Sequence, residues 1–404
     1  MRVAIVGAGA AGLVTAWLVS ERHDVAVYER APIVGGNVRT LGGNVPWSSD
    51  ERVDAGVIEL ERTRFPTVFR LLGRLGVQLV RVPGTTTLFP RSGPRWYSPR
   101  TVSDAGLPPL RQLRELLRLQ PLRVGYLRLK DAARTPWGHR GPPPLRDLRL
   151  DEVLGSGPYA RWMALLVMYA WSIELPEVGG LAAELAVPML RRFADASEWF
   201  GVEGGVFAYQ AAILARLRGR VHTGVDVRVR RDPDGVVVAH PDGTEARFDA
   251  VVLAVPPHRV LGALADADVD ERRRFGGCQG RLAHVLIHDD LGPYTRRGHT
   301  YTSEFDVFEL PGGQGGYNAR LDRLCRLRSW RGLAFGLDAE IAPERVQWRQ
   351  EHDVPLLDLA CARWRDEIEA TQGRRRTWYA GAWLGDGLHE GAFSSAERAA
   401  RALG

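Results

Sequence analysis

Apolar and polar positions in the first 30 residues follow the pattern of a strand, a helix and a second strand. Residues 3–6 are all apolar and precede a glycine, which predicts a buried parallel strand. Residues 10–20 have the composition of a helix, and residues 24–28 predict a second strand that ends at Glu29. A β-α-β unit is therefore expected at the start of the chain.

The pattern further along predicts a mixed α/β protein, with helical and strand-like periodicities alternating to the last residues. The expected elements are, in chain order, an amphipathic helix at 65–77, a turn-rich strand-like segment at 83–99, a helix at 109–133, several helices within 150–200, a glycine turn and helix at 202–217, strands at 221–231, 235–240 and 248–254, strands within 280–340, a helix at 355–370, and a strand, glycine-rich loop and helix at 376–403.

Three glycines between the first strand and helix indicate a bound dinucleotide. Gly7, Gly9 and Gly12 have G-x-G-x-x-G spacing, in which the first allows a tight turn and the second lets a pyrophosphate approach the backbone. The third lets the helix pack closely on the strand. Glu29 follows Gly7 by 22 residues, where a carboxylate can accept a hydrogen bond from a ribose 2′-hydroxyl and would repel a 2′-phosphate. These features do not separate NAD from FAD.

Three further segments favour FAD. Residues 34–40, VGGNVRT, contain a glycine pair that lets the backbone pass close to a pyrophosphate and a ribityl chain. Residues 54–56, Asp-Ala-Gly, offer backbone that can lie against an isoalloxazine ring. The last helix starts near residues 388–390, Leu-His-Glu, and its first N–H groups would present positive dipole to a ligand.

Together these motifs resemble those of the FAD-dependent amine oxidase and protoporphyrinogen oxidase superfamily. The most specific likeness is GLHEGAFSSAERAA at 387–400, which is similar to the closing helix of that superfamily, and YAGAW, EGGVFAYQAAILARL and VVLAVPP are similar to other FAD-contacting segments. Within this superfamily the chain most resembles a bacterial subgroup, the predicted NAD/FAD-binding or FAD-dependent oxidoreductases. The shared segments are DAGVIELERTRFPTVFRLLGRLGV, AWSIELPE and VLIHDD. The resemblance covers nearly the whole chain.

The resemblance implies an α/β fold in which a Rossmann-like FAD-binding domain is interleaved with an α+β substrate-binding domain. Residues 1–60, 200–260 and 370–404 are expected to form the first domain, and residues 61–199 and 261–369 the second. FAD is expected to be noncovalent. The residues that the resemblance places at FAD are Gly7, Gly9, Ala11 and Gly12 at the pyrophosphate, Glu29 at the adenosine ribose, Gly36, Asn37, Arg39 and Thr40 along the phosphates and flavin, Val227 at adenine, Gly381 and Ala382 at the ribityl chain, and Leu388 and His389 at the flavin edge. Arg30 is a further expected FAD-binding residue.

The chain departs from well-known amine oxidases at three positions. Those proteins keep a lysine near flavin N5, whereas the only lysine here, Lys130, stands in an arginine-rich segment. Leu388 takes the place of an aromatic residue of the amine cage, and Ala382 that of an acid. Catalytic candidates are His389, Glu59 and His288. For His389 a role in capping the last helix is favoured over catalysis, and for His288 a structural hydrogen bond is favoured over proton transfer. Glu59 can equally face the flavin or be a surface or salt-bridged acid. Trp171 and Trp383 are candidates for the substrate pocket wall.

Composition narrows the partners and the compartment. The net charge is +6, but 53 of 54 basic residues are arginine and are scattered among 48 acids, which argues against nucleic-acid binding. Only residues 111–146 are locally basic, which suits a solvated helical face, an acidic ligand or peripheral membrane contact. The longest apolar run, 163–173, is too short to span a bilayer. The first strand begins at residue 3, which leaves no room for a secretory signal. Three widely spaced cysteines form no metal or disulfide pattern. Both observations predict a cytoplasmic protein.

The leading functional hypothesis is an FAD-dependent oxidoreductase that takes hydride from a C–H bond of a small organic or lipid-like substrate to flavin N5. Oxygen or another acceptor would then reoxidise the flavin. Three alternatives stay open: an amine oxidase proper, a redox-neutral double-bond isomerase, and a flavoprotein without catalytic activity. The sequence alone assigns neither the substrate nor the oligomeric state.

Overall fold

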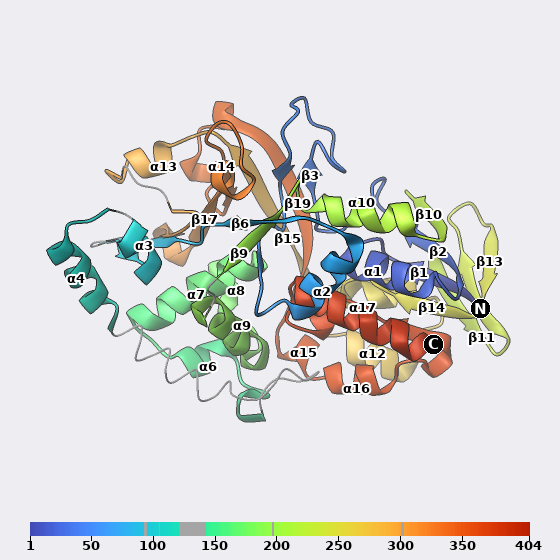
Figure 1. Cartoon of the computed structure of the whole chain (residues 1–404). Helices are drawn as coiled ribbons and strands as arrows, with labels where there is room; N and C mark the ends of the chain where they lie inside the picture. Colours follow the sequence, from blue (N-terminus) through green and yellow to red (C-terminus); the bar gives the residue numbers. More distant parts are fainter. Residues whose placement is uncertain (93–94, 105, 121–142, 196–197, 300–302) are drawn as a thin grey trace.

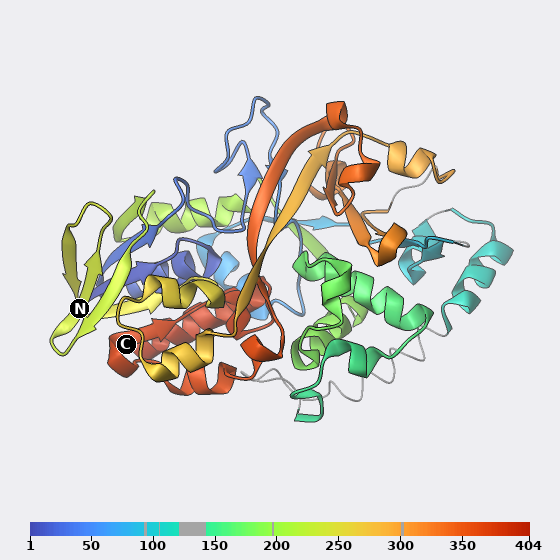
Figure 2. The same cartoon turned by 180° about the vertical axis from the view of Figure 1, so that it is seen from behind.

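The computed structural model describes residues 1–404 except 93–94, 105, 121–142, 196–197 and 300–302. The chain forms two lobes, with the termini and a parallel sheet in one and a group of helices against a second sheet in the other (Figure 1). Two long paired strands, β15 (Gln279–His288) and β19 (Val346–Leu356), rise between the lobes, as Figure 2 shows from behind.

A five-stranded parallel sheet forms the centre of the first lobe. Its strand order is β10 (Gly219–Thr223), β2 (Asp24–Glu29), β1 (Arg2–Val6), β14 (Ala250–Leu253) and β20 (Thr377–Tyr379). The predicted strands of the opening β-α-β unit and of the C-terminal segment are thus confirmed. Three separate parts of the chain contribute strands to this sheet, and the full domain division predicted from the sequence stays a prediction.

Four helices share a hydrophobic core with the three central strands of this sheet, β2, β1 and β14. They are α1 (Ala10–Val19), α2 (Pro66–Leu75), α10 (Phe207–Arg216) and α17 (His389–Leu403). The helix predicted at 65–77 therefore packs with α10 and α17, although the predicted division assigns it to the substrate domain. Its apolar positions Val68, Leu71, Leu72 and Leu75 are all buried, which explains this placement.

Two of the predicted strands have different bounds in the structure. Residues 221–231 split into β10 and β11 (Arg228–Asp232), because the chain turns at Gly224, whose φ of +71° suits glycine. The strand predicted at 248–254 is present as β14, and only its first residue, Phe248, belongs to the preceding strand β13 (Glu245–Phe248). β11, β12 (Gly235–Ala239) and β13 form a separate antiparallel sheet, so a change of sheet, invisible in local hydrophobicity, accounts for both differences.

The second lobe is built on a seven-stranded sheet in the order β19, β15, β18 (Gly332–Phe335), β17 (Gly315–Arg320), β16 (Phe305–Glu309), β7 (Thr86–Phe89) and β8 (Trp96–Tyr97). A smaller sheet of β5 (Leu60–Glu61), β9 (Trp199–Val202) and β6 (Leu79–Val82) joins the lobes. The other helices that the structure describes in this lobe include α3 (Pro99–Asp104), α4 (Pro109–Arg118), α6 (Leu150–Leu154), α7 (Pro158–Trp171), α8 (Leu175–Val178) and α9 (Ala183–Asp195).

Helix α4 covers the start of the helix predicted at 109–133, and the rest of that range lies largely outside the described residues. The helix predicted at 355–370 is present as two short helices, α15 (Leu359–Ala362) and α16 (Arg365–Ala370). No helix in the described part of the chain is long and apolar enough to cross a membrane.

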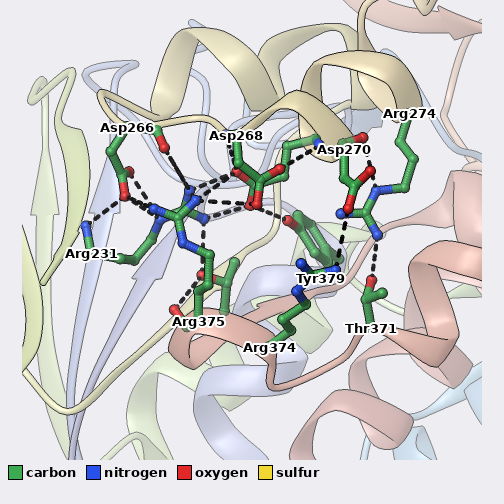
Figure 3. A network of polar contacts seen from close by, with 11 residues as sticks. Arg231, Asp266, Asp268, Asp270, Arg274, Thr371, Arg374, Arg375 and Tyr379 are labelled. Carbon is green, nitrogen blue, oxygen red and sulfur yellow. Dashed lines mark hydrogen bonds and ion pairs between the residues drawn. The ribbon is translucent and has the colours of Figure 1, made fainter. Parts of the chain in front are cut away.

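A buried network of ion pairs ties β11 to the C-terminal segment (Figure 3). The side chain of Arg231 is 2% exposed, and its guanidinium binds Glu271 through two contacts of 2.7 Å and Asp266 through one of 2.9 Å. Glu271 belongs to α12 (Val269–Phe275), and it also accepts hydrogen bonds from Tyr379 and Arg375. The network therefore connects segments that are more than 100 residues apart in sequence.

We expect Arg231→Met to lower the free energy of unfolding by about 3–5 kcal/mol, because it leaves two carboxylates without their main buried partner. Arg230→Met is the matched control, since Arg230 is half exposed and its ion pair with Asp232 belongs to the weak surface class, worth less than about 1 kcal/mol. Denaturant unfolding of both variants measures the difference. Equal free energies of unfolding for the two variants would show that the buried network does not stabilise the fold more than a surface ion pair does.

Candidate active site

A cavity of about 660 Å³ lies between the lobes and is lined by residues of both. At one end it follows the loops after β1 and β2, and at the other it reaches α7 and the sheet of the second lobe. The sequence-predicted residues that line it are Gly7, Gly9, Ala11, Glu29, Arg30, Gly36, Asn37, Arg39, Val227, Gly381, Ala382, Leu388 and His389, together with Glu59, Trp171 and Trp383.

Two of the three motif glycines, Gly7 and Gly12, leave no room for a side chain. Gly7 has a φ of +103°, and a Cβ there would lie 2.5 Å from the carbonyl oxygen of Ala254. A Cβ on Gly12 would lie 1.9 Å from the carbonyl oxygen of Gly7, which confirms that this glycine allows α1 to pack closely on β1. The N–H groups of Ala10 and Ala11, at the start of α1, have no acceptor among the described residues, so the helix presents unpaired donors to the cavity.

Glu29 stands at the end of β2 with its carboxylate fixed by two backbone groups. One oxygen accepts a hydrogen bond from the Ala8 N–H at 2.8 Å, and the other accepts from the Ala31 N–H at 2.9 Å. Each oxygen keeps further acceptor capacity. The carboxylate is thus held rigidly beside the glycine turn, at the place where the sequence predicts a ribose.

Two predicted FAD residues do not line the cavity. Gly12 acts through packing, as described above. The hydroxyl of Thr40 donates to Asp54 and accepts from the Phe207 N–H at 3.0 Å, so it helps to cap the start of α10. Arg39, by contrast, lines the cavity, and its guanidinium donates to the carbonyl oxygens of Val34 and Val38. Burial lowers the pKa of Arg39.

The last helix begins beside the cavity. Asp386 accepts hydrogen bonds from the N–H groups of Leu388 and Gly391, both at 2.8 Å. The N–H groups of His389 and Glu390 have no acceptor in the described part of the chain. The Glu390 carboxylate instead accepts from the N–H groups of Thr67 and Val68 and caps α2. Of these two free donors, only the one on His389 belongs to a residue that lines the cavity.

The His389 side chain is packed rather than free. Its Nε2 lies 3.1 Å from the Tyr209 hydroxyl, and its ring lies against Tyr209 and Phe393. Burial lowers the pKa of His389 to about 4, so the imidazole is neutral at physiological pH.

The far end of the cavity carries a carboxyl group among aromatic rings. The Tyr169 hydroxyl donates to Glu59 at 2.6 Å, and the Tyr317 hydroxyl lies 2.9 Å from the Ser172 hydroxyl. The rings of Tyr169 and Tyr317 meet edge to face, with centroids 4.8 Å apart. Trp171 and Trp199 also line this end.

Burial raises the pKa of Glu59 to about 7, although the hydrogen bond from Tyr169 acts in the opposite direction. Glu59 is partly exposed, and it lines the cavity. The cavity therefore holds a carboxyl group that changes its charge near neutral pH, which is a property suited to proton transfer.

His288, the third catalytic candidate, lies outside the cavity. Its Nε2 donates to Asn318 Oδ1 at 2.9 Å, and its Nδ1 accepts from the Asp290 N–H at 3.2 Å. Both ring nitrogens are thus engaged in structural hydrogen bonds. Lys130 lies outside the described residues.

Residues 10–267 match the family of flavin-containing amine oxidoreductases, which is more than half of the chain. The chain belongs to this family. It is therefore an FAD-dependent oxidoreductase acting on a small-molecule substrate, and the α/β fold with a Rossmann-like FAD-binding domain is confirmed. No curated protein sequence is significantly similar to it.

Solved structures share the fold of this flavin-containing amine oxidoreductase at low identity. Putrescine oxidase bound to putrescine is 16% identical with a TM-score of 0.67, covering 100% of this chain and 99% of that one. Cyclohexylamine oxidase from Brevibacterium oxydans is 16% identical with a TM-score of 0.69, covering 100% and 99%. A fatty acid isomerase from P. acnes is 20% identical with a TM-score of 0.71, covering 99% and 98%.

FAD fits the donors and acceptors that face the cavity in this flavin-containing amine oxidoreductase. One such group belongs to His352 on β19, which the sequence analysis did not predict as a site residue. Its Nε2–H donates to the Ala55 carbonyl oxygen at 2.6 Å, while its Nδ1 is buried without a partner in the part of the chain that the structure describes. Burial lowers the pKa of His352 to about 4, so Nδ1 is a neutral acceptor that a cofactor N–H or O–H group would satisfy.

We predict that the His389 backbone N–H, and not the imidazole, interacts with the flavin. His389→Pro deletes this donor, and proline is tolerated because His389 is the first residue of α17 and Leu388 before it has extended backbone, with φ −118° and ψ −169°. We expect flavin reduction to slow about 5- to 30-fold, the equivalent of about 1–2 kcal/mol of helix-terminus stabilisation.

His389→Ala is the matched control, since it removes the imidazole and keeps the N–H. Rapid-mixing measurements of flavin reduction should give nearly wild-type rates for this variant. Near-total loss of reduction in both variants would make the imidazole catalytic and overturn the prediction.

Proposed function

We propose that this enzyme oxidises the C–H bond next to the nitrogen of an apolar amine. The observation that carries the proposal is the Glu59 carboxyl group, which lies among aromatic rings at the far end of the cavity and receives a hydrogen bond from Tyr169. The sequence left an amine oxidase proper open as an alternative, although Leu388 stands where the family has an aromatic residue of its amine cage. Tyr169, Tyr317 and Trp199 supply aromatic surface from other elements.

We further propose that FAD occupies the other end of the cavity. Gly7, Gly9 and Ala11 would hold its pyrophosphate with the unpaired donors of α1, and Glu29 would bind its adenosine ribose. The remaining contacts are proposed for the cavity-lining residues Arg30, Gly36, Asn37, Arg39, Val227, Gly381, Ala382, Leu388 and His389. When bound, FAD supplies a two-electron acceptor for the C–H bond.

The charge and shape of the far end suit a cationic amine. Aromatic faces attract an ammonium group, and this attraction is strongest where water is excluded. An ionised Glu59 strengthens the attraction, whereas a carboxylate substrate would be repelled by it. The mixture of tryptophan, tyrosine and aliphatic side chains around Glu59 favours an apolar substituent on the nitrogen.

The proposed role of Glu59 is to accept the proton that the ammonium group must lose before its C–H bond is oxidised. Tyr169 holds the carboxylate in place by donating its hydroxyl hydrogen to one oxygen. A pKa of about 7 allows Glu59 to take up this proton and release it again near neutral pH. The reacting group would lie between walls formed by Trp171, Tyr317 and Trp199.

Three ligands with the same apolar body test the substrate class: cyclohexylmethylamine, cyclohexylmethanol and cyclohexanecarboxylate. Turnover by the FAD-loaded enzyme, measured with an artificial electron acceptor, should give a kcat/KM for the amine on the order of 100-fold above the other two. Comparable turnover of the alcohol, or turnover of the carboxylate alone, would contradict the amine assignment.

A further inference from the structure

Helix α4 (Pro109–Arg118) carries an unusual share of the exposed apolar surface. It lies at the outer end of the second lobe, away from the parallel sheet, in both views (Figures 1 and 2). Eight large hydrophobic side chains are exposed among the described residues, and four of them are on this ten-residue helix. They are Leu110, Leu113, Leu116 and Leu117, which are between 40% and 84% exposed.

Three polar side chains of the helix, Gln112, Glu115 and Arg118, are half-buried on the side that faces the protein. Gln112 donates to the carbonyl oxygen of Leu107 at 2.8 Å, and Glu115 pairs with Arg118 at 2.6 Å. The Arg118 guanidinium in turn lies 5.0 Å from the ring centre of Trp96. A surface helix of a globular protein normally does the reverse and buries its apolar face. The outward leucine face therefore has no partner among the described residues.

Exposed positive charge lies beside the leucines. By helical periodicity Leu110, Leu113 and Leu117 share one face, with Leu116 next to them, and Arg111 and Arg114 flank that face. Both arginines are exposed. Glu115 is the one acid in the helix, and its ion pair with Arg118 neutralises it. The surface that α4 offers is consequently both apolar and cationic.

We propose that α4 docks the enzyme on an anionic phospholipid surface. A helix that lies in the plane of a membrane interface buries leucines at the boundary of the acyl chains and places arginines at the phosphates. A second copy of the chain fits the patch less well, because a two-fold interface brings Arg111 and Arg114 of both copies together. The contact is peripheral and leaves the active-site cavity, which α4 does not line, unchanged.

Sedimentation with vesicles tests the docking surface in the full-length holoenzyme. The wild type should bind vesicles that contain phosphatidylglycerol and phosphatidylcholine at least about tenfold more tightly than vesicles of phosphatidylcholine alone, and added salt should weaken the binding. The triple variant Leu110→Gln, Leu113→Gln, Leu117→Gln should lose most of the binding. Arg111→Gln with Arg114→Gln should lose about fivefold for each arginine.

Val269→Gln with Leu291→Gln is the control, since both side chains are exposed hydrophobics on other elements. This variant should bind vesicles like the wild type, and turnover of a soluble substrate should be unchanged in every variant. Absence of wild-type binding at low salt, or equal binding by the leucine triple variant, would overturn the proposal. A leucine-dependent dimer that ignores vesicles would overturn it as well and assign the face to a second copy.

Discussion

Replacing Glu59 with glutamine should lower kcat/KM for amine oxidation by about 100- to 10,000-fold, the usual contribution of a positioned acid–base group. Glutamine keeps the size of the side chain and can still accept the hydrogen bond from Tyr169, but it takes up no proton. Steady-state kinetics with an apolar amine measure the loss. Retention of more than about a tenth of the wild-type value would show that Glu59 is not the proton acceptor.

The pH profile separates proton transfer from simple packing. Glu59 accepts a proton only when it is ionised, and burial raises its pKa to about 7. Wild-type kcat/KM should therefore rise with pH up to about 7, and this rise should be absent in Glu59→Gln. Tyr169→Phe removes the hydrogen bond that favours the ionised form, so the rise should move to higher pH. A pH profile of Tyr169→Phe identical to that of the wild type would show that the hydrogen bond from Tyr169 does not lower the pKa of Glu59.

Replacing Glu29 with alanine should weaken FAD binding by about 10- to 150-fold, because hydrogen bonds to a charged acceptor are worth about 1.5–3 kcal/mol. The carboxylate also holds the N–H groups of Ala8 and Ala31, which shape the glycine turn, and Glu29→Ala loses both interactions. Glu29→Gln keeps one acceptor oxygen and should have intermediate affinity. Titration of the apoprotein with FAD, followed by flavin fluorescence, measures all three proteins.

Glu21→Ala serves as the control for Glu29→Ala, because Glu21 is an exposed acid in the turn between α1 and β2. Its FAD affinity and circular dichroism spectrum should match the wild type. If Glu29→Ala binds FAD as tightly as Glu21→Ala does, the assignment of Glu29 to the ribose fails.

The end of the cavity that we propose for FAD is largely predictable from sequence because its residues are grouped along the chain. The strand, glycine turn, helix and acid that create the first part fall within residues 3–29, and their roles follow from local geometry. The closing helix is also a local feature, since Gly387 precedes a run of good helix formers. The contacts of Thr40 go beyond its motif, because its hydroxyl binds Asp54 and the Phe207 N–H, two partners that only tertiary packing brings to it.

The substrate end is not predictable in the same way. Glu59 and Tyr169 are 110 residues apart, and they meet only because α7 packs across the sheet of the second lobe. His352 reaches the cavity from β19, a strand with no recognisable motif. The outward leucines of α4 are likewise indistinguishable in sequence from a buried apolar face. Contacts of this kind depend on tertiary packing, which hydrophobic periodicity does not encode.

Anaerobic mixing of the FAD-loaded enzyme with one equivalent of an apolar amine tests the central proposal most directly. Both the flavin absorbance and the fate of the amine are followed in a single turnover. The proposal predicts that the oxidised flavin band disappears while one amine per flavin is converted to the carbonyl compound formed when its imine hydrolyses. A flavin that stays oxidised while the amine is recovered unchanged would contradict the proposal. Isomerisation of an unsaturated acid, mixed with the enzyme in place of the amine under the same conditions, would contradict it as well.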